Sequence, residues 1–282
     1  MRLVAVFFGL TCLLHCSSAF AITGDAPLAS GFAARPIVMI VDARDDLCTG
    51  AALARDLVLT AAHCVVRKSD YRVKIFQTGQ SITVRSIALH PGFNLASYAA
   101  SRATADVALL KLAVPLSDQV VPATLAPARR IAVGEQLTIA GFGVTVAGTP
   151  RGLGVPRMAK LSVTGAPSSL QVRLFDIATR DERIGLGACT GDSGAPVYES
   201  SGALIGLVSW STAPRDEEGC GGLTGVTPLL AYRTWIIDTA RRWGRSSLRP
   251  VNNPRRMISP SQSTARRLPA KHGAPVSSVI RD

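Results

Sequence analysis

Several patterns that mark common sites are missing from this chain of 282 residues. The spacings CxxC and HxxxH, which are typical of zinc sites, do not occur. No internal repeat is visible, and the apolar run at residues 4–14 reaches only about half the length that a helix needs to cross a bilayer. A zinc site is therefore not expected, and neither is a membrane span. Histidine is scarce too, and the four present are His15, His63, His90 and His272.

The first 21 residues have the features of a leader. Arg2 precedes the apolar run, and Ala19-Phe20-Ala21 fits the small-x-small pattern of a signal-peptidase site. We expect residues 1–21 to be a cleaved signal peptide and the protein to be secreted, to the extracellular space or the periplasm. An uncleaved anchor is one alternative. A lipoprotein attached through Cys16 is another, although the residues before it make a poor lipobox.

Cleavage after Ala21 would remove Cys12 and Cys16 and leave four of the six cysteines. An even number of cysteines in an exported chain indicates disulfide bonds. Four cysteines allow three pairings, and their spacing alone does not choose among them.

The net charge of +12 is concentrated at the C-terminal end, where residues 244–282 contain eight Lys or Arg and one acid. This tail is rich in Pro and Ser and shows no apolar periodicity, which predicts disorder. A basic segment can contact an anionic surface, and a solvated extension that tolerates charge is the plainer interpretation. Recognition of a specific nucleic acid is not expected.

Short runs rich in β-branched or alternating apolar residues predict strands, and Gly, Pro, Ser and Asp separate them. This pattern favours an all-β sandwich or barrel. One long helix is expected at 228–243, and the polar stretch near 115–130 is the expected crossing between two halves. The expected strands are 36–42, 57–60, 72–76, 82–89, 107–112, 136–140, 159–163, 171–175 and 203–210.

Residues 189–194, CTGDSG, set Ser193 between the glycines Gly191 and Gly194. Glycines let the backbone approach a substrate closely and direct N–H groups toward it. An oxyanion hole needs such donors, aimed at the charge that develops on an attacked carbonyl.

Two further motifs supply a base and an acid. Residues 60–64, TAAHC, contain His63, and residues 106–112, DVALLKL, begin with Asp106, a carboxylate that needs a specific partner if it is buried. A serine hydroxyl is a weak nucleophile until a positioned base takes its proton. Of the four histidines, His63 is the candidate base, because two lie in the leader and the tail and His90 merely precedes a proline.

The three motifs resemble those of the trypsin/chymotrypsin-type serine protease family over residues 22–243. The resemblance implies two antiparallel β-barrels with the active site at their seam and a C-terminal helix. It implies a serine endopeptidase without metal or cofactor. Ser193 would attack the peptide carbonyl, and His63 would accept its proton and return it to the leaving amine. Asp106 would orient His63, and the N–H groups of Gly191 and Ser193 would hold the oxyanion.

The same resemblance pairs Cys48 with Cys64 and Cys189 with Cys220. It sets the base of the specificity pocket at Gly187, where enzymes that cleave after Lys or Arg carry Asp. Small to medium uncharged residues are therefore expected before the cleaved bond, because nothing offsets the desolvation of a cation. The expected pocket walls are Ser209, Trp210, Ser211, Gly225 and Val226.

Family members are activated by a new N-terminus whose ammonium pairs with the aspartate before the nucleophile. Ile22-Thr23-Gly24-Asp25 resembles that terminus, follows the expected cleavage site directly and lies 41 residues before His63. We therefore expect export to create the active terminus, Ile22 to pair with Asp192, and no zymogen step. The alternative is that Ile22 begins a disordered arm.

Two other functions stay open. One is a catalytically silent binding protein on the same scaffold, and the other is a protein anchored to a surface by its basic tail. The expected partners are polypeptide substrates, with a proteinaceous inhibitor and an anionic surface as further candidates. The expected state is a monomer.

Overall fold

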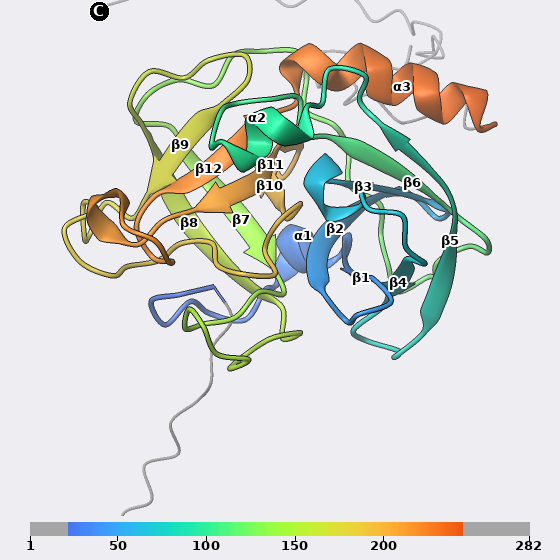
Figure 1. Ribbon diagram of the computed structural model, residues 1–282, viewed down its shortest axis with the longest axis horizontal. Coiled ribbons are helices and arrows are strands. Elements are labelled where there is room, and N and C mark those ends of the chain that lie inside the picture. Colours follow the sequence, from blue (N-terminus) through green and yellow to red (C-terminus); the bar gives the residue numbers. More distant parts are fainter. Residues whose placement is uncertain (1–21, 245–282) are drawn as a thin grey trace, which may run out of the picture. The chain divides into compact units, whose positions relative to one another are not determined.

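A computed structural model describes residues 22–244 of the chain. The predicted leader at 1–21 and all but the first residue of the predicted tail lie outside the described residues. The strands form two closed antiparallel barrels of six strands each, so the expectation of an all-β fold with two barrels is confirmed. In Figure 1 the two barrels lie side by side.

The first barrel has the strand order β1-β2-β3-β6-β5-β4. Its interior is filled by apolar side chains such as Val38, Ile40 and Leu110, each no more than 1% exposed. Its strands are β1 (Ile37–Val41), β2 (Leu47–Ala54), β3 (Leu57–Thr60), β4 (Arg72–Lys74), β5 (Ser81–Leu89) and β6 (Ala108–Leu112).

The second barrel has the order β10-β11-β12-β9-β8-β7. Its core includes Leu137, Ile139 and, from the start of the described chain, Ile22. Its strands are β7 (Gln136–Gly141), β8 (Arg157–Thr164), β9 (Val172–Phe175), β10 (Pro196–Tyr198), β11 (Leu204–Ser211) and β12 (Thr224–Pro228).

Three strands, β2, β10 and β12, were not predicted. β2 reads LCTGAALA, and its small residues have little preference for strands. A Cβ at Gly50 would lie 2.8 Å from side-chain carbons of Ile40 and Val58, so the barrel interior requires a small residue there. β12 contains Gly225 and Pro228, which are depleted in strands, and β10 is only three residues long.

The helices are α1 (Gly31–Ala34), α2 (Leu95–Ala99) and α3 (Arg233–Arg242), with 3-10 turns at Ala62–Cys64, Pro214–Asp216 and Leu230–Tyr232. The predicted start of the last helix at 228 was wrong. Pro228 ends β12, and the N–H of Leu229 still donates to the carbonyl of Ile205 at 2.9 Å, so α3 begins only at Arg233. No helix within 22–244 is long and apolar enough to cross a membrane.

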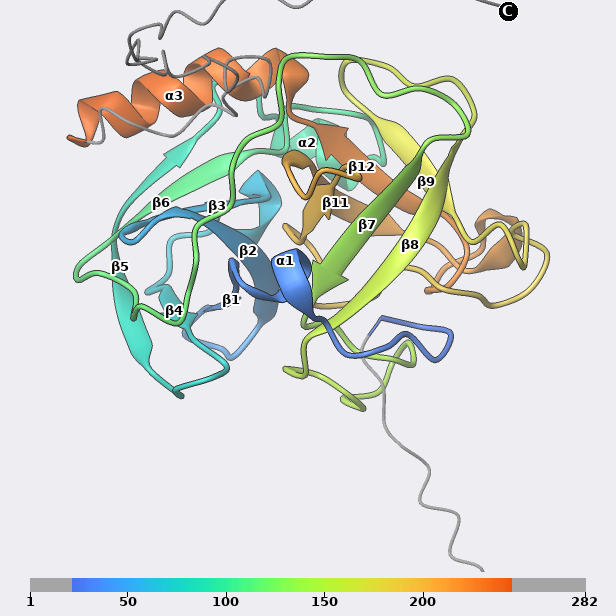
Figure 2. The ribbon, with the colours of Figure 1, turned by 180° about the vertical axis from the view of Figure 1, so that it is seen from behind.

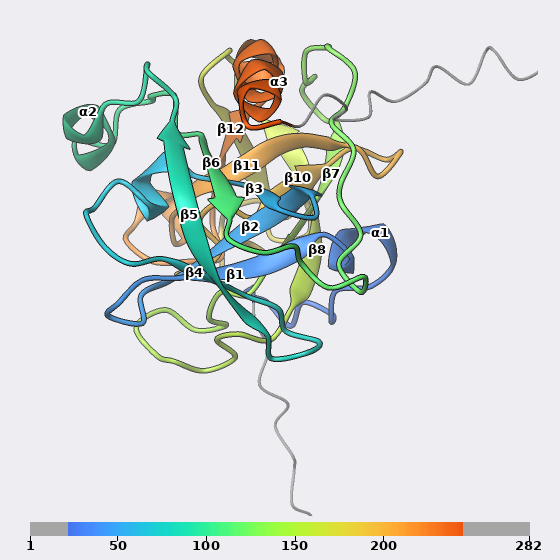
Figure 3. The same ribbon diagram turned by 90° about the vertical axis from the view of Figure 1, so that its right-hand side faces the viewer.

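α3 joins the two barrels through a shared apolar cluster. Ile236 and Ala240 of the helix belong to the same cluster as Leu59 of the first barrel and Leu207 of the second. The connection between β6 and β7 crosses the back of this unit (Figure 2), whereas α2 lies at its front, as Figure 3 shows from the side. α2 therefore lies over the front of the junction between the two barrels.

Candidate active site

A cavity of about 480 Å³ lies between the barrels. His63, in the 3-10 turn after β3, lines it on the side of the first barrel. Ser193, in the loop before β10, and the end of β11 line it on the side of the second. The fold thus brings together residues that are 130 positions apart in the chain.

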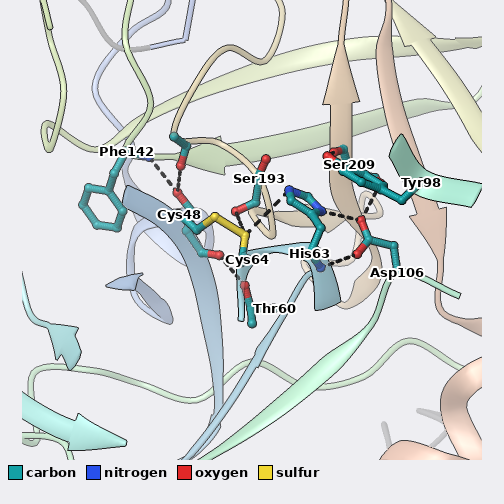
Figure 4. The surroundings of a disulfide bond; sticks show 11 residues. Cys48, Thr60, His63, Cys64, Tyr98, Asp106, Phe142, Ser193 and Ser209 are labelled. Carbon is teal, nitrogen blue, oxygen red and sulfur yellow. Dashed lines mark hydrogen bonds and ion pairs between the residues drawn. A yellow bond between two sulfur atoms is a disulfide. The ribbon is translucent and has the colours of Figure 1, made fainter. Parts of the chain in front are cut away.

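Asp106 holds the His63 ring by its edge. Asp106 Oδ2 lies 2.8 Å from His63 Nδ1, and Oδ1 accepts the His63 backbone N–H at 2.9 Å (Figure 4). The Ser209 hydroxyl donates to the same Oδ2 at 2.6 Å, and the carboxylate side chain is only 1% exposed. Burial by itself raises the pKa of Asp106, but the hydrogen bonds from His63 and Ser209 outweigh it and lower that pKa below its usual value. Asp106 is therefore charged at neutral pH.

The Ser193 loop is held against the first barrel by Thr49 of β2, a residue that the motifs did not single out. The Thr49 backbone N–H donates to the Ser193 carbonyl at 2.8 Å, and its hydroxyl donates to the Gly191 carbonyl at 2.9 Å. The same hydroxyl accepts the Phe142 N–H at 3.1 Å. The loop carbonyls thus point toward β2.

The N–H groups of Gly191 and Ser193 donate to no backbone oxygen within the described residues. Gly191 has φ +97°, and a Cβ there would lie 2.8 Å from Gly143 Cα, so glycine is required for this turn. Two free N–H groups beside a serine match the requirement for an oxyanion hole. Among the described residues, no hydrogen bond joins the Ser193 hydroxyl to His63. In enzymes of this kind that hydrogen bond often forms or shortens only when substrate binds.

Asp192 is fully buried and accepts the N–H groups of Gly143 at 2.8 Å and Cys189 at 2.9 Å. Burial raises its pKa to about 7, because these two bonds only partly compensate the loss of water. No ion pair among residues 22–244 includes Asp192. Ile22 is also fully buried, but no hydrogen bond links it to Asp192 while its nitrogen is part of a peptide bond.

Only some of the expected pocket residues line this cavity. Ser209, Trp210 and Ser211 line the cavity together with Ala188, whereas Gly187 and Gly225 do not line it. A Cβ at Gly225 would lie 1.9 Å from the Trp210 ring, so the indole covers this glycine.

A second cavity of about 570 Å³ continues along the same end of β11. Ser209, Trp210 and Ser211 line both cavities, and so does Tyr98 of α2. Three acidic residues of the loop between β11 and β12 line only the second cavity: Asp216, Glu217 and Glu218.

Two disulfides form, Cys48–Cys64 and Cys189–Cys220, as the resemblance predicted. The first joins β2 to the turn that carries His63, and the second joins the Ser193 loop to the loop before β12. Because Cys48 and Cys64 are bonded to each other, they offer no thiolate to a metal beside His63.

Residues 30–236 match the family model Trypsin. The chain is 28% identical to kallikrein 1-related peptidase b8 of Mus musculus, over 72% of this chain and 83% of that protein. It is 30% identical to a trypsin of Phaedon cochleariae, over 68% of this chain and 78% of that protein. The solved structure of neuropsin, a serine protease of mouse brain, has a TM-score of 0.62 at 24% identity and shares the fold over 76% of this chain and 98% of its own. The chain belongs to the trypsin family of serine endopeptidases.

Proposed function

We propose that Ser193 is the nucleophile of this endopeptidase, His63 its general base and Asp106 the group that orients His63. The observation that carries this assignment is the His63–Asp106 pair, joined by two hydrogen bonds at 2.8 and 2.9 Å, with His63 lining the same cavity as Ser193. His63 takes the hydroxyl proton as Ser193 attacks the carbonyl and returns it to the leaving amine. Asp106 holds the ring in one tautomer and stabilises its charged form.

The N–H groups of Gly191 and Ser193 are proposed to bind the oxyanion. The hydrogen bonds from Thr49 to the two carbonyls of this loop support the assignment, because they keep the carbonyl oxygens away from the attacked carbon. Such preorganised donors act on charge that exists only in the transition state.

A fluorophosphonate probe tests the assignment of the nucleophile. The processed protein should become labelled at Ser193, and the Ser193→Ala variant should not react. Labelling at another serine, or a processed and folded protein that does not react, would overturn the assignment.

We further propose cleavage after small to medium uncharged residues such as Ala, Val, Leu or Met. Gly187 and Ala188 offer no carboxylate to a cationic side chain, and the acids that line the cavity, Asp42 and Asp46, both pair with Arg44. Discrimination by size is weak, because one methylene group contributes roughly 1–3 kcal/mol, so the profile should be broad. Cleavage of a peptide library should show this preference, and Arg as the best residue by more than tenfold would contradict it.

Secretion and activation are proposed to be one event. Ile22 has φ +53°, a conformation that β-branched residues rarely adopt, and this restraint disappears when the peptide bond before it is cut. Cleavage after Ala21 would also supply an ammonium group to Asp192, a buried carboxylate without a cation among the described residues. The N-terminal sequence of the exported protein should read Ile-Thr-Gly-Asp, and a mature terminus at another residue would refute the proposal.

A further inference from the structure

Tyr98 of α2 lies flat against His63. The centroids of the two rings are 4.3 Å apart and their planes are inclined by 12°. Asp106 meets the edge of the imidazole, so Tyr98 and Asp106 contact it from two different directions (Figure 4). The His63 side chain is 13% exposed, and the stacked ring is part of what shields it.

Tyr98 is itself held in place. Its hydroxyl donates to the Ser209 carbonyl at 3.3 Å, and the hydroxyl of Ser209 binds Asp106, so one residue connects the tyrosine to the carboxylate. Burial, with a smaller contribution from the charge of Asp106, raises the pKa of Tyr98, which keeps its hydroxyl a donor. At the start of α2, Asn94 Oδ1 accepts the Ser97 N–H at 2.8 Å and caps the helix.

We propose that Tyr98 is a positioning residue for His63, whose ring face keeps the imidazole against Asp106 and stabilises the imidazolium that forms as Ser193 loses its proton. The face of an aromatic ring attracts a cation within about 6 Å of its centroid, and the attraction grows when water is excluded. The inference rests on the roles proposed above for His63 and Ser193.

Because the imidazolium forms only during reaction, the ring face should act on the transition state and not on substrate binding. The matched variants are Tyr98→Leu, which keeps apolar bulk but has no aromatic face, and Tyr98→Phe, which keeps the face but has no hydroxyl. Leucine also suits a helix. Leu95→Ala is the control for α2, because Leu95 is 50% exposed and lines neither cavity.

The first measurement is the rate at which a fluorophosphonate labels Ser193. This probe carries no peptide, so its rate does not depend on substrate contacts in the second cavity, which Tyr98 also lines. The second is kcat and KM for a good peptide. We expect Tyr98→Leu to lower the labelling rate and kcat by roughly three- to tenfold with KM nearly unchanged, as a cation–aromatic contact predicts. Tyr98→Phe should restore most of both rates, and Leu95→Ala should match the unmodified protein.

The outcomes separate this proposal from the one it rests on. If Ser193 of the unmodified protein is not labelled, the proposed nucleophile is wrong. If labelling is normal and Tyr98→Leu reacts equally fast, or changes KM alone, the positioning role is overturned. If Tyr98→Phe is as slow as Tyr98→Leu, the hydroxyl acts and the ring face does not. Tyr98→Met, also without an aromatic face, repeats the measurement if the thermal midpoint of Tyr98→Leu falls.

Discussion

His63 and Ser193 line one cavity, but the two halves of the site are held by different interactions. On the side of the first barrel, Asp106 is bound by His63 and Ser209, and its pKa is lowered. On the side of the second, Asp192 is buried beside Ser193, the proposed nucleophile, with two backbone donors, and its pKa is raised to about 7. One buried carboxylate has its partners, and the other lacks a cation among the described residues.

The difference teaches that burial alone does not define the role of a carboxylate. Hydrogen bonds from His63 and Ser209 stabilise the charged form of Asp106. The part of the site on the first barrel, the histidine half, therefore already has its partners, whereas the part around Ser193, the serine half, does not. Asp192 still lacks a positively charged partner among the described residues, and a buried charge without a counter-charge is costly. The serine half is thus where a new N-terminus would have its effect.

Both halves of the site are proposed to take part in the reaction, so removing a reacting group from either half should cause the largest loss of activity. Ser193→Ala, His63→Ala and Asp106→Asn should each lower kcat by about 10⁴-fold or more while the protein stays folded. The double variant Ser193→Ala/His63→Ala should lose little more than the worse single variant, because the residues act as a unit. Steady-state kinetics with an unfolding curve for each variant measures this, and unimpaired turnover by Asp106→Asn would show that another group orients His63.

The raised pKa of Asp192 predicts a pH-dependent stability of the unprocessed chain. A carboxyl whose pKa is higher in the folded state binds its proton more tightly there, so folding stability declines as pH rises from about 4 to about 7. A difference of about three pKa units corresponds to about 4 kcal/mol at most. Denaturant unfolding of the Ser193→Ala chain that still carries residues 1–21, at pH 5 and pH 8, should show the decline. The same variant beginning at Ile22 should lack it, and equal pH dependence of the two forms would contradict the pairing with Asp192.

The length of the N-terminus should control the serine half alone. A chain that begins at Ala21 lacks the Ile22 ammonium group, and the loop around Gly191 should lose its geometry. Loss of one oxyanion donor lowers kcat by about 10²–10³-fold, which is the expected size of the effect. The effect is measured by comparing kcat of this chain with kcat of a chain that begins at Ile22. As a control, the disulfide Cys48–Cys64 should form in both chains. Full activity with Ala21 retained would refute the activation mechanism.

Thr49 offers the smallest of these tests. Thr49→Val removes the hydroxyl that binds the Gly191 carbonyl and the Phe142 N–H, and leaves both buried groups without this partner. The free energy of unfolding should fall by about 1–3 kcal/mol. Thr49→Ser keeps the hydroxyl and is the matched control in the same denaturant titration. Equal loss in both variants would assign the effect to packing of the methyl group.

Local sequence was enough to find most strands and all three motifs. β3 was predicted with its observed bounds, Leu57–Thr60, because its run of β-branched and leucine residues is buried on all sides. β2 was missed, since its small residues are chosen by the barrel interior around Gly50 and not by strand preference. The helix at the end was predicted too long, because pairing with β11 outweighs local preference at Pro228.

The site shows the same division. Ser193, His63 and Asp106 stand in local frames that are readable from the chain, because each motif must shape its own backbone. Their cysteine neighbours allowed three pairings, and the spatial approach of the strands selects one. Thr49 and Tyr98 have no such frame. Their contacts depend on the positions that β2 and α2 take after the barrels close. These positions cannot be inferred from the separation of the residues along the chain. The types of reacting groups are therefore written in short segments of the chain, whereas their orientation and charge depend on long-range packing and on the exclusion of water.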